Sequence, residues 1–311
     1  MYIDKLRLKL KQSGTKNFVK ECLNAITLNK ADFNWRCRVL KKDMLDYDFF
    51  KRKYGDIINK TDWDMISTEP IPKRIWICWF QGEKDAPEIV KICMSSVRKS
   101  FPEYEIIILT DENINKYIKF PDYIRDKRKR GLIGPAQYSD MIRLELLTKY
   151  GGIWLDATVL CTSGKFIGQL IEEDTELFVY KDFQALNRYV GVSSWCIVAR
   201  KENPYLMTVK NMMFDYWKTN KYLCNYYSFH IFFMIIAELK GEKWKQIPTY
   251  SNQPPHILQS ELFTDYKEQR LEQILQMSDI HKLSYKFSKE EFQLNNTMYK
   301  YLKKIYLETD I

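Results

Sequence analysis

The sequence predicts an α/β fold, in which a sheet is flanked by helices, with a basic helical segment before it and a mainly helical part after it. Two nearly continuous apolar runs, residues 74–80 and 105–110, are typical of strands buried on both faces. The helix predicted between them makes a strand–helix–strand unit, which joins parallel strands through a right-handed crossover. A third apolar run, residues 152–156, follows a predicted helix and a Gly-Gly pair.

The elements of this fold follow one another along the chain. The Pro70-Ile-Pro72 break separates the basic helical segment, residues 1–68, from a domain expected over residues 69–311. After the first strand, Pro87 opens a helix, because proline is compatible with a first helical turn. The later expectations are strands at 177–180 and 195–199, helices at 204–219 and 228–239, and a loop at 253–256.

Composition indicates a folded, reduced protein. With 311 residues and 45% hydrophobic content the chain can bury a sizeable core, and 15% aromatic content argues against disorder. The longest apolar run, residues 231–237, is too short to cross a bilayer, and the N-terminus lacks the pattern of a secretory signal. Seven cysteines without a CxxC pair favour a cytoplasmic protein without disulfides or zinc.

Positive charge is concentrated at the N-terminus. The chain has a net charge of +9, and residues 1–53 hold 14 lysines and arginines against 6 acids, which is +8. Such a segment can lie on an anionic membrane surface, where each cation contributes about 1 kcal/mol, or it can be an ordinary solvated helical face. Nucleic acid is not expected as a partner, because no known binding module accompanies the charge.

The helix predicted over residues 137–149 carries an acid and a base on one face. Asp140 and Arg143 are three residues apart, so they are neighbours on the helix surface. If that face lines a cleft, they can bind sugar hydroxyls and a phosphate, with arginine supplying a planar fork of donors. The alternative is an ordinary ion pair within the helix.

Asp156 lies where the third strand ends. In open α/β sheets ligands bind at the carboxyl ends of strands, and Gly151 and Gly152 allow the backbone to approach a neighbour closely. Hard cations such as Mg²⁺ and Mn²⁺ prefer oxygen ligands and bridge diphosphate oxygens. Asp156, with the hydroxyl of Thr158, is therefore a candidate metal ligand, and the alternative is a capping or turn aspartate.

Three motifs in this order carry a family resemblance: Pro72-Lys-Arg-Ile-Trp-Ile-Cys-Trp, Ser139-Asp140-x-x-Arg143 and Gly151-Gly-Ile-Trp-Leu-Asp156-Ala-Thr158. Over residues 71–163 the chain resembles the capsular polysaccharide synthesis glycosyltransferases. These are related to the DxD-containing sugar transferases and, distantly, to the clostridial glucosylating toxins. The resemblance implies a GT-A fold with a Rossmann-like mixed sheet. It also implies transfer, with retention of configuration, from a nucleoside-diphosphate sugar such as a UDP-sugar.

The resemblance also implies roles for single aromatic and amide side chains. By position, Trp76 would stack on the nucleobase, Asn113 would reach the nucleotide or sugar, and Trp154 would line the donor site. From the residues alone, the alternative for Trp76 is a core aromatic of a strand.

The charged motif residues receive the central roles. Ser139, Asp140 and Arg143 would bind ribose or donor-sugar hydroxyls. Asp156, with Thr158, would hold Mn²⁺ or Mg²⁺ and through it the diphosphate. The expected catalytic set is therefore Asp156, Asp140 and Arg143.

Thr158 stands where the family has the second acid of DxD. A hydroxyl is a poorer metal ligand, so metal affinity is low, another acid completes the site, or a lysine or arginine neutralises the leaving diphosphate. Because related enzymes close a C-terminal loop over the donor, Lys282 and Ser284 are the expected diphosphate clamp. His281 is expected at the surface, and His230 in the core.

The predicted function is that of a glycosyltransferase that builds a bacterial surface polysaccharide. It would act in the cytoplasm, as a peripheral protein at the inner face of the membrane, with a lipid-linked oligosaccharide as acceptor. The missing second acid motivates an alternative from another class. In that alternative the protein is a non-catalytic subunit of a synthesis complex that binds a sugar nucleotide or a glycan.

Overall fold

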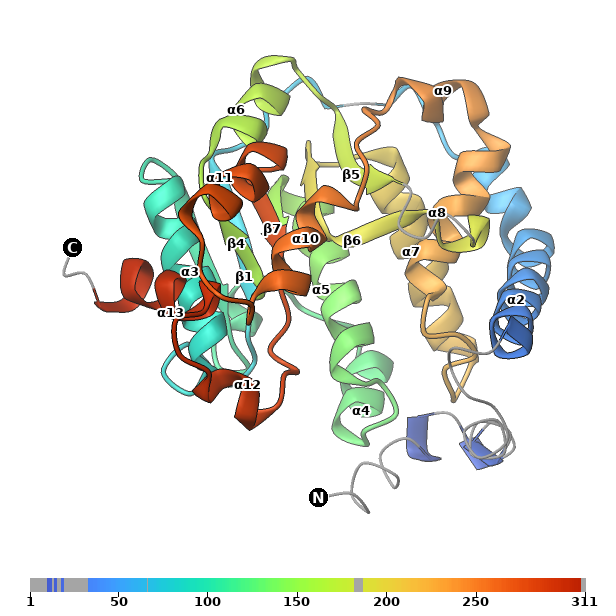
Figure 1. Cartoon of the computed structure of the whole chain (residues 1–311). Helices are drawn as coiled ribbons and strands as arrows, with labels where there is room; N and C mark the ends of the chain where they lie inside the picture. Colours follow the sequence, from blue (N-terminus) through green and yellow to red (C-terminus); the bar gives the residue numbers. More distant parts are fainter. Residues whose placement is uncertain are drawn as a thin grey trace.

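The structure is a computed structural model that describes residues 10–12, 14–15, 18–19, 33–65, 67–181 and 187–308 (Figure 1). The strands are β1 (Arg74–Cys78), β2 (Glu105–Leu109), β3 (Gly152–Leu155), β4 (Val159–Cys161), β5 (Leu177–Lys181), β6 (Val192–Ala199) and β7 (Ile280–Lys282). The longer helices are α2 (Phe33–Lys60), α3 (Glu88–Ser100), α5 (Pro135–Tyr150), α7 (Pro204–Thr219), α8 (Ser228–Leu239) and α11 (Glu268–Met277). The shorter ones are α4 (Asp122–Lys129), α6 (Lys165–Glu172), α9 (Gly241–Gln246), α10 (Pro254–Glu261), α12 (Lys289–Gln293) and α13 (Met298–Lys303). Single turns lie at Ile114–Lys116, Arg188–Val190 and Lys304–Glu308.

The strands form a five-stranded mixed sheet in the order β2-β1-β3-β6-β5, and β4 pairs with β7 in a separate ladder. β1 is parallel to β2 and to β3, with Trp76 opposite Ile107 on one side and Trp154 on the other. β6 is antiparallel to both β3 and β5. The predicted α/β fold with a mixed sheet flanked by helices is thereby confirmed, as is the parallel β1-α3-β2 unit.

Alternation along the strands divides the core into two layers. In β1, Ile75 and Ile77 pack on the side of α3, whereas Trp76 packs on the side of α5, α7 and α8. β3 repeats the pattern, because successive side chains of a strand point to opposite faces. Ile153 joins the α3 side and Trp154 joins the α5 side, so the sheet is covered on both faces.

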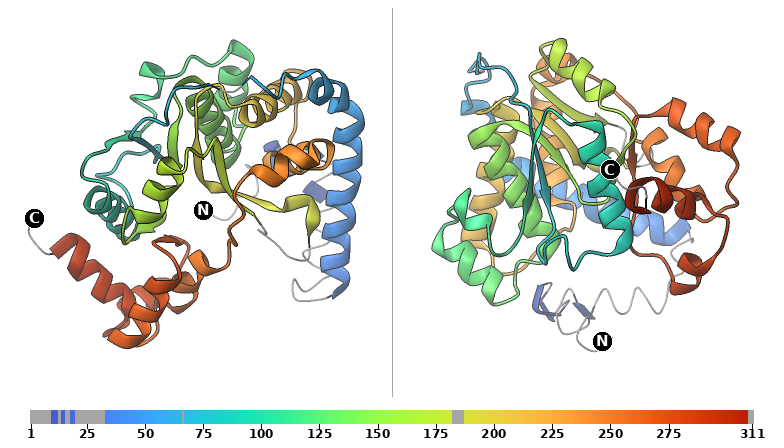
Figure 2. Two further views of the ribbon diagram at one scale, coloured as in Figure 1. Left: turned by 90° about the horizontal axis from the view of Figure 1, so that it is seen from above. Right: turned by 90° about the vertical axis from the view of Figure 1, so that its left-hand side faces the viewer.

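Helix α2 belongs to the core on the α5 side. Its buried residues Tyr47, Phe50, Tyr54 and Ile58 recur every three or four positions and so form one apolar face. The ring of Phe50 lies 4.8 Å, centroid to centroid, from that of Phe232 in α8. Figure 2 shows α2 and the C-terminal helices on opposite sides of the molecule. The domain boundary expected near residue 68 stays a prediction.

The apolar run at residues 231–237 lies within α8, and Ile231, Phe232 and Phe233 are fully buried there. The expected buried helix is therefore confirmed. Across the described ranges, no helix combines the length and the apolar character that crossing a membrane requires.

Two parts of the C-terminal region differ from the expectation. Residues 253–256 are not a loop throughout, because α10 begins at Pro254. Proline is tolerated there, since the first turn of a helix needs no amide donor. The mainly helical C-terminal part also contains β7, which pairs with β4. Strands this short leave no readable alternation in the sequence.

Candidate active site

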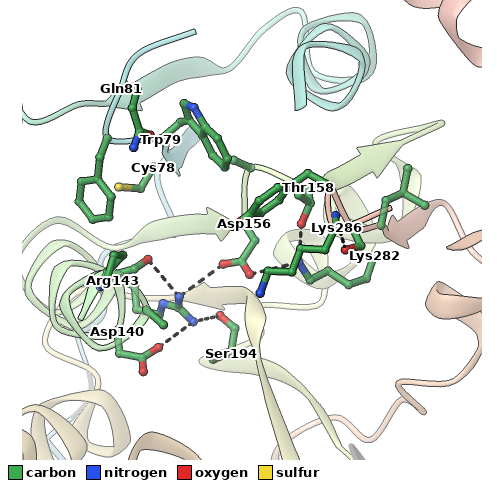
Figure 3. Close-up of a pocket in the computed structure, with 18 of the residues that line it drawn as sticks. Cys78, Trp79, Gln81, Asp140, Arg143, Asp156, Thr158, Ser194, Lys282 and Lys286 are labelled. Carbon is green, nitrogen blue, oxygen red and sulfur yellow. Dashed lines mark hydrogen bonds and ion pairs between the residues drawn. The ribbon is translucent and has the colours of Figure 1, made fainter. Parts of the chain in front are cut away.

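A cavity of about 550 Å³ lies at the carboxyl ends of β1 and β3 (Figure 3). Its walls come from four segments far apart in the sequence. These are residues 78–81 at the end of β1, residues 135–143 of α5, residues 156–158 after β3, and residues 282–286 at the end of β7. Ser194, Tyr226 and His230 complete the lining. The cavity therefore lies where an open α/β sheet is expected to bind its ligand.

Arg143 organises the floor of the cavity. Its buried guanidinium donates to the Ser194 carbonyl oxygen at 2.6 Å and to Ser139 Oγ at 3.2 Å. It also forms ion pairs with Asp140 Oδ1 at 3.2 Å and with Asp156 Oδ1 at 3.4 Å. The planar fork of donors thus holds both predicted acids in fixed positions. Asp140 and Arg143 form the intrahelical ion pair considered as an alternative, and they also line the cavity.

The chain reaches this arrangement through a tight connection between α5 and β3. α5 ends at Tyr150 and is capped by Gly151, whose φ is +66°, and Gly152 follows with a φ of +100°. A Cβ on Gly152 would lie 2.7 Å from the Arg74 carbonyl oxygen of the neighbouring strand. The close backbone approach expected of the Gly-Gly pair is therefore confirmed. The two glycines reverse the chain, so that β3 runs back alongside α5 and Asp156 lies beside Arg143.

Asp156 is held from three sides. It continues the alternation of β3, so it shares a side with Trp154, whose Nε1 donates to Asp156 Oδ1 at 3.0 Å. Asp156 Oδ2 lies 3.3 Å from Lys282 Nζ. Burial favours the neutral acid, but Lys282 and Arg143, helped by the Trp154 indole, outweigh it and hold the pKa of Asp156 below its ordinary value. Asp156 is therefore an ionised, preorganised carboxylate.

Asp140 has the opposite electrostatic character. Burial raises the pKa of Asp140 to about 7. The positive charge of Arg143 lowers the pKa and the negative charge of Asp156 raises it, but burial has the largest effect. Only 10% of its side chain is exposed, and Gln137 Nε2 donates to its Oδ2 at 3.4 Å. Its charge therefore changes in the neutral pH range.

Lys282 reaches the site through the β4–β7 ladder. Val159 and Lys282 are register partners, which brings this C-terminal lysine beside the turn that follows β3. Its ammonium donates to Thr158 Oγ1 and pairs with Asp156. Lys286 points into the same cavity (Figure 3), and Ser284 Oγ, also at the cavity, accepts from the Lys286 backbone amide at 3.0 Å.

Three predicted donor-site residues, Trp76, Asn113 and Trp154, do not line the cavity. Trp154 is buried and reaches the site only through its hydrogen bond to Asp156. Trp76 is fully buried in the core, where its Nε1 donates to the Gly151 carbonyl oxygen at 3.1 Å, so it does not line the cavity. The Asn113 side chain accepts from the Thr110 amide at 2.9 Å and donates to the Ile108 carbonyl oxygen at 2.8 Å. Both of its polar groups thus stabilise the turn after β2, outside the cavity lining.

The sequence reasoning missed the aromatic pair at the cavity. Trp79 lies just past the end of β1, and its ring meets that of Tyr285 edge-on, with centroids 5.3 Å apart. Trp79 Nε1 is buried without a hydrogen-bond partner. The available signal was the second tryptophan of the same run, which follows Trp76 by three residues.

Two histidines and one cysteine in or beside the cavity are uncharged at neutral pH. His230 lines the cavity, and burial together with Arg143 lowers its pKa to about 3. His281, expected at the surface, is instead fully buried in β7, and burial lowers its pKa to about 4. Burial also raises the pKa of the Cys78 thiol, at the cavity, to about 12. A histidine base or a cysteine thiolate is therefore disfavoured here.

The residues around Asp156 do not fit a divalent metal centre. Mg²⁺ is usually held by one or two carboxylates together with substrate phosphates and water, so a cation already placed on the carboxylate competes with it directly. Here the predicted ligands are a single carboxylate and a hydroxyl, and the Lys282 ammonium contacts both. The carboxylate of Asp140 is paired with Arg143. The part of the chain that the structure describes contains no group of three His, Cys, Asp or Glu side chains that could hold a metal ion.

Comparison with known proteins connects this geometry to a family. The profile of the family described as "Capsular polysaccharide synthesis protein" matches residues 21–302, a range that contains every residue of the cavity. A stretch of 110 residues, 32% of this chain, is 27% identical to the O-glycosyltransferase braB of Annulohypoxylon truncatum. That match spans 25% of the fungal protein, so the chain covers about a quarter of this relative.

Two solved glycosyltransferases are similar in structure. The PaToxG glycosyltransferase has a TM-score of 0.39 and 14% identity, and the match covers 85% of this chain and 97% of that one. The apo-form glycosyltransferase GlyE of Streptococcus pneumoniae TIGR4 has a TM-score of 0.38 and 11% identity, with coverage of 76% and 63%.

Proposed function

The chain belongs to the family of capsular polysaccharide synthesis proteins, and we propose that it is a glycosyltransferase that moves a sugar from a nucleoside-diphosphate sugar to a growing surface polysaccharide. One observation carries the proposal: Arg143 and Lys282 both pair with Asp156 in a cavity at the carboxyl end of β3. Fixed cations beside an ionised carboxylate suit a ligand that joins a diphosphate to sugar hydroxyls.

The charge of the cavity favours an anion. Arg143, Lys282 and Lys286 face two acids, of which Asp140 is only partly ionised at neutral pH. The N-terminal turn of α5 also lines the cavity, and the positive end of a helix dipole attracts negative charge. A diphosphate placed here would meet compensating charge on several sides.

We assign the nucleobase to Trp79 and Tyr285 in place of the core residue Trp76. Trp79 offers a ring at the cavity and an unpartnered buried Nε1 donor, and Tyr285 packs edge-on against it. Aromatic faces of this kind bind bases by stacking. The nucleotide that we propose is UDP, as the family resemblance implies.

In the proposed reaction the bond between the anomeric carbon and the β-phosphate oxygen breaks, and its electron pair stays on the phosphate. A hydroxyl oxygen of a lipid-linked oligosaccharide bonds to the anomeric carbon from the same face, and its proton passes to the leaving phosphate. This sequence retains the configuration. Arg143 and Lys282 stabilise the negative charge that develops on the diphosphate, and Asp156 holds both cations in position.

A panel of nucleotide sugars tests the proposal. A donor that binds raises the unfolding temperature by mass action, and slow hydrolysis of that donor reports the chemistry. We expect Asp156→Ala to slow hydrolysis by about 100-fold, as removal of other preorganised charge-stabilising groups does. Asp64→Ala removes an exposed carboxylate, paired with Lys243, and should leave the rate unchanged.

Hydrolysis at the wild-type rate in Asp156→Ala would refute the assignment. Binding of a donor without hydrolysis, or without transfer to any acceptor, would instead favour the non-catalytic binding subunit.

We further propose that α2 contacts the cytoplasmic face of the membrane, where a lipid-linked acceptor lies. Leu45 and Phe49 are 53% and 50% exposed, on the side of α2 that faces away from its buried face. The basic residues Lys41, Lys42 and Arg52 are exposed near them. Apolar side chains rimmed by lysine and arginine are typical of helices that lie on anionic lipid. Residues 1–9, 13, 16–17 and 20–32 of the basic segment lie outside the described residues.

Co-sedimentation with lipid vesicles tests this contact. We expect binding to phosphatidylcholine vesicles that contain phosphatidylserine, weaker binding to pure phosphatidylcholine, and loss of binding in Leu45→Ser/Phe49→Ser. Met277→Ser removes a similarly exposed apolar side chain from α11 and should have no effect. Equal sedimentation of the double variant and the wild type would contradict the contact.

A further inference from the structure

Lys282 occupies the place between Asp156 and Thr158 where a metal would bind if Thr158 were the second acid of a DxD motif. Its Nζ lies 3.3 Å from Asp156 Oδ2 and donates to Thr158 Oγ1. The ammonium therefore contacts both side chains from which metal ligation was expected. A divalent cation at the same position would meet direct repulsion from this charge.

The backbone holds Lys282 in place beside Asp156 and Thr158. Lys282 is the register partner of Val159, and the Leu283 amide donates to the Thr158 carbonyl oxygen at 2.9 Å. Main-chain hydrogen bonds thus tie the lysine to the turn that carries Asp156 and Thr158. The Lys282 side chain still lines the cavity, with 19% of its surface exposed.

The number of charges also matches. A divalent cation brings two positive charges to a diphosphate, and Lys282 together with Lys286 brings the same number to this cavity. Figure 3 shows both lysines pointing toward the region in front of Asp156. Lys286 is exposed, so it can adjust to a ligand, whereas Lys282 is anchored by the β4–β7 ladder.

We propose that the ammonium of Lys282, assisted by Lys286, takes the charge-neutralising role of a divalent cation, so that the donor site binds a nucleoside diphosphate without metal. This inference rests on the proposed function, because it concerns the diphosphate of the same donor. In this proposal Thr158, which stands in place of the second acid, has a role of its own, because its hydroxyl accepts from the lysine that substitutes for the metal.

Titration calorimetry with UDP tests the inference, with GDP, ADP, CDP and TDP as further probes. We expect the Kd of the nucleotide that binds to agree within about twofold between buffer with EDTA and buffer with Mn²⁺. Lys282→Met should weaken binding by about 10- to 100-fold in both buffers, the range that loss of a charged hydrogen bond gives. Lys289→Met removes an exposed lysine of α12 and should bind like the wild type.

A converted site provides an independent readout. Thr158→Asp/Lys282→Ala removes the ammonium and restores a second carboxylate, so its binding of the nucleotide should become dependent on Mn²⁺. Measuring the Kd of the wild-type protein in both buffers needs no variant. This comparison therefore still decides the question if Lys282→Met does not fold.

The outcomes separate the two proposals. Binding of a nucleotide only in the presence of Mn²⁺ would overturn the role of Lys282 and leave the proposed glycosyltransferase function intact. Binding of none of the nucleotides in either buffer would instead overturn the proposed donor site itself. An unchanged Kd in folded Lys282→Met would also overturn the inference.

Discussion

Replacement of Asp140 by asparagine should change how the stability of this protein depends on pH. Burial raises the pKa of Asp140 to about 7, whereas in the unfolded chain the carboxyl has its ordinary pKa of 3.8. The folded state therefore binds this proton more tightly. The resulting stabilisation is complete below the unfolded pKa and is lost as the pH rises through the folded pKa. Asparagine has nearly the shape of the protonated acid and does not titrate.

The size of the effect follows from the two pKa values. Between pH 5 and pH 8 the wild-type protein should lose about 3 kcal/mol of folding free energy through this group, since one pKa unit corresponds to about 1.4 kcal/mol. Asp140→Asn lacks this loss, so its stability relative to the wild type should rise by about 3 kcal/mol over the same interval. The side chain is only 10% exposed, so screening by solvent is small.

Urea unfolding of both proteins at pH 5 and pH 8 measures this difference directly. His230 and His281 are buried and neutral in both proteins, so their contributions cancel in the comparison. Asp156 has a lowered pKa, so its stabilisation is lost only at more acidic pH. A stability difference that stays constant between pH 5 and pH 8 would refute the electrostatic account of the cavity floor.

Three further substitutions test other parts of the site. Gly152→Ala should destabilise the fold by about 1–3 kcal/mol, since its φ of +100° and the close neighbouring strand disfavour a Cβ. Gly168→Ala, inside helix α6 with open space around its Cβ position, should instead stabilise the fold by up to about 1 kcal/mol in the same thermal unfolding assay. Arg143→Lys keeps the charge but loses the planar fork, and we expect donor hydrolysis to fall about tenfold or more with the circular dichroism spectrum unchanged. Trp79→Ala should raise the Kd of the nucleotide by about tenfold, and Trp79→Phe should bind nearly as tightly as the wild type. A Kd of Trp79→Ala equal to that of the wild type would exclude stacking of the base on Trp79.

The sequence predicted those parts of the fold that local patterns determine. The strands β1, β2 and β3 are continuous apolar runs, and helix α5 is bounded by Pro135 and by Gly151. Asp156 and Arg143 could be placed together because only a two-glycine connection separates their elements. Their ion pair follows from the return of α5 over β3.

The parts that escaped prediction depend on strand register and on non-local pairing. The predicted first strand ran past Cys78, so the sequence could not show that Trp76 faces the core while Trp79 faces the cavity. Lys282 was chosen from its likeness to a C-terminal clamp, but its contact with Thr158 arises from a three-residue ladder between distant segments. Pairing of this kind leaves no periodic signal in the sequence.

A nucleoside diphosphate should bind against Lys282 at Asp156 without a metal ion. A crystal structure of the protein with UDP, grown in the presence of EDTA, shows whether it does. We predict diphosphate oxygens within hydrogen-bonding distance of the Lys282 ammonium and the base against Trp79. A nucleotide bound outside the cavity, or one that appears only with Mn²⁺ seated on Asp156 and Lys282 displaced, would contradict the claim.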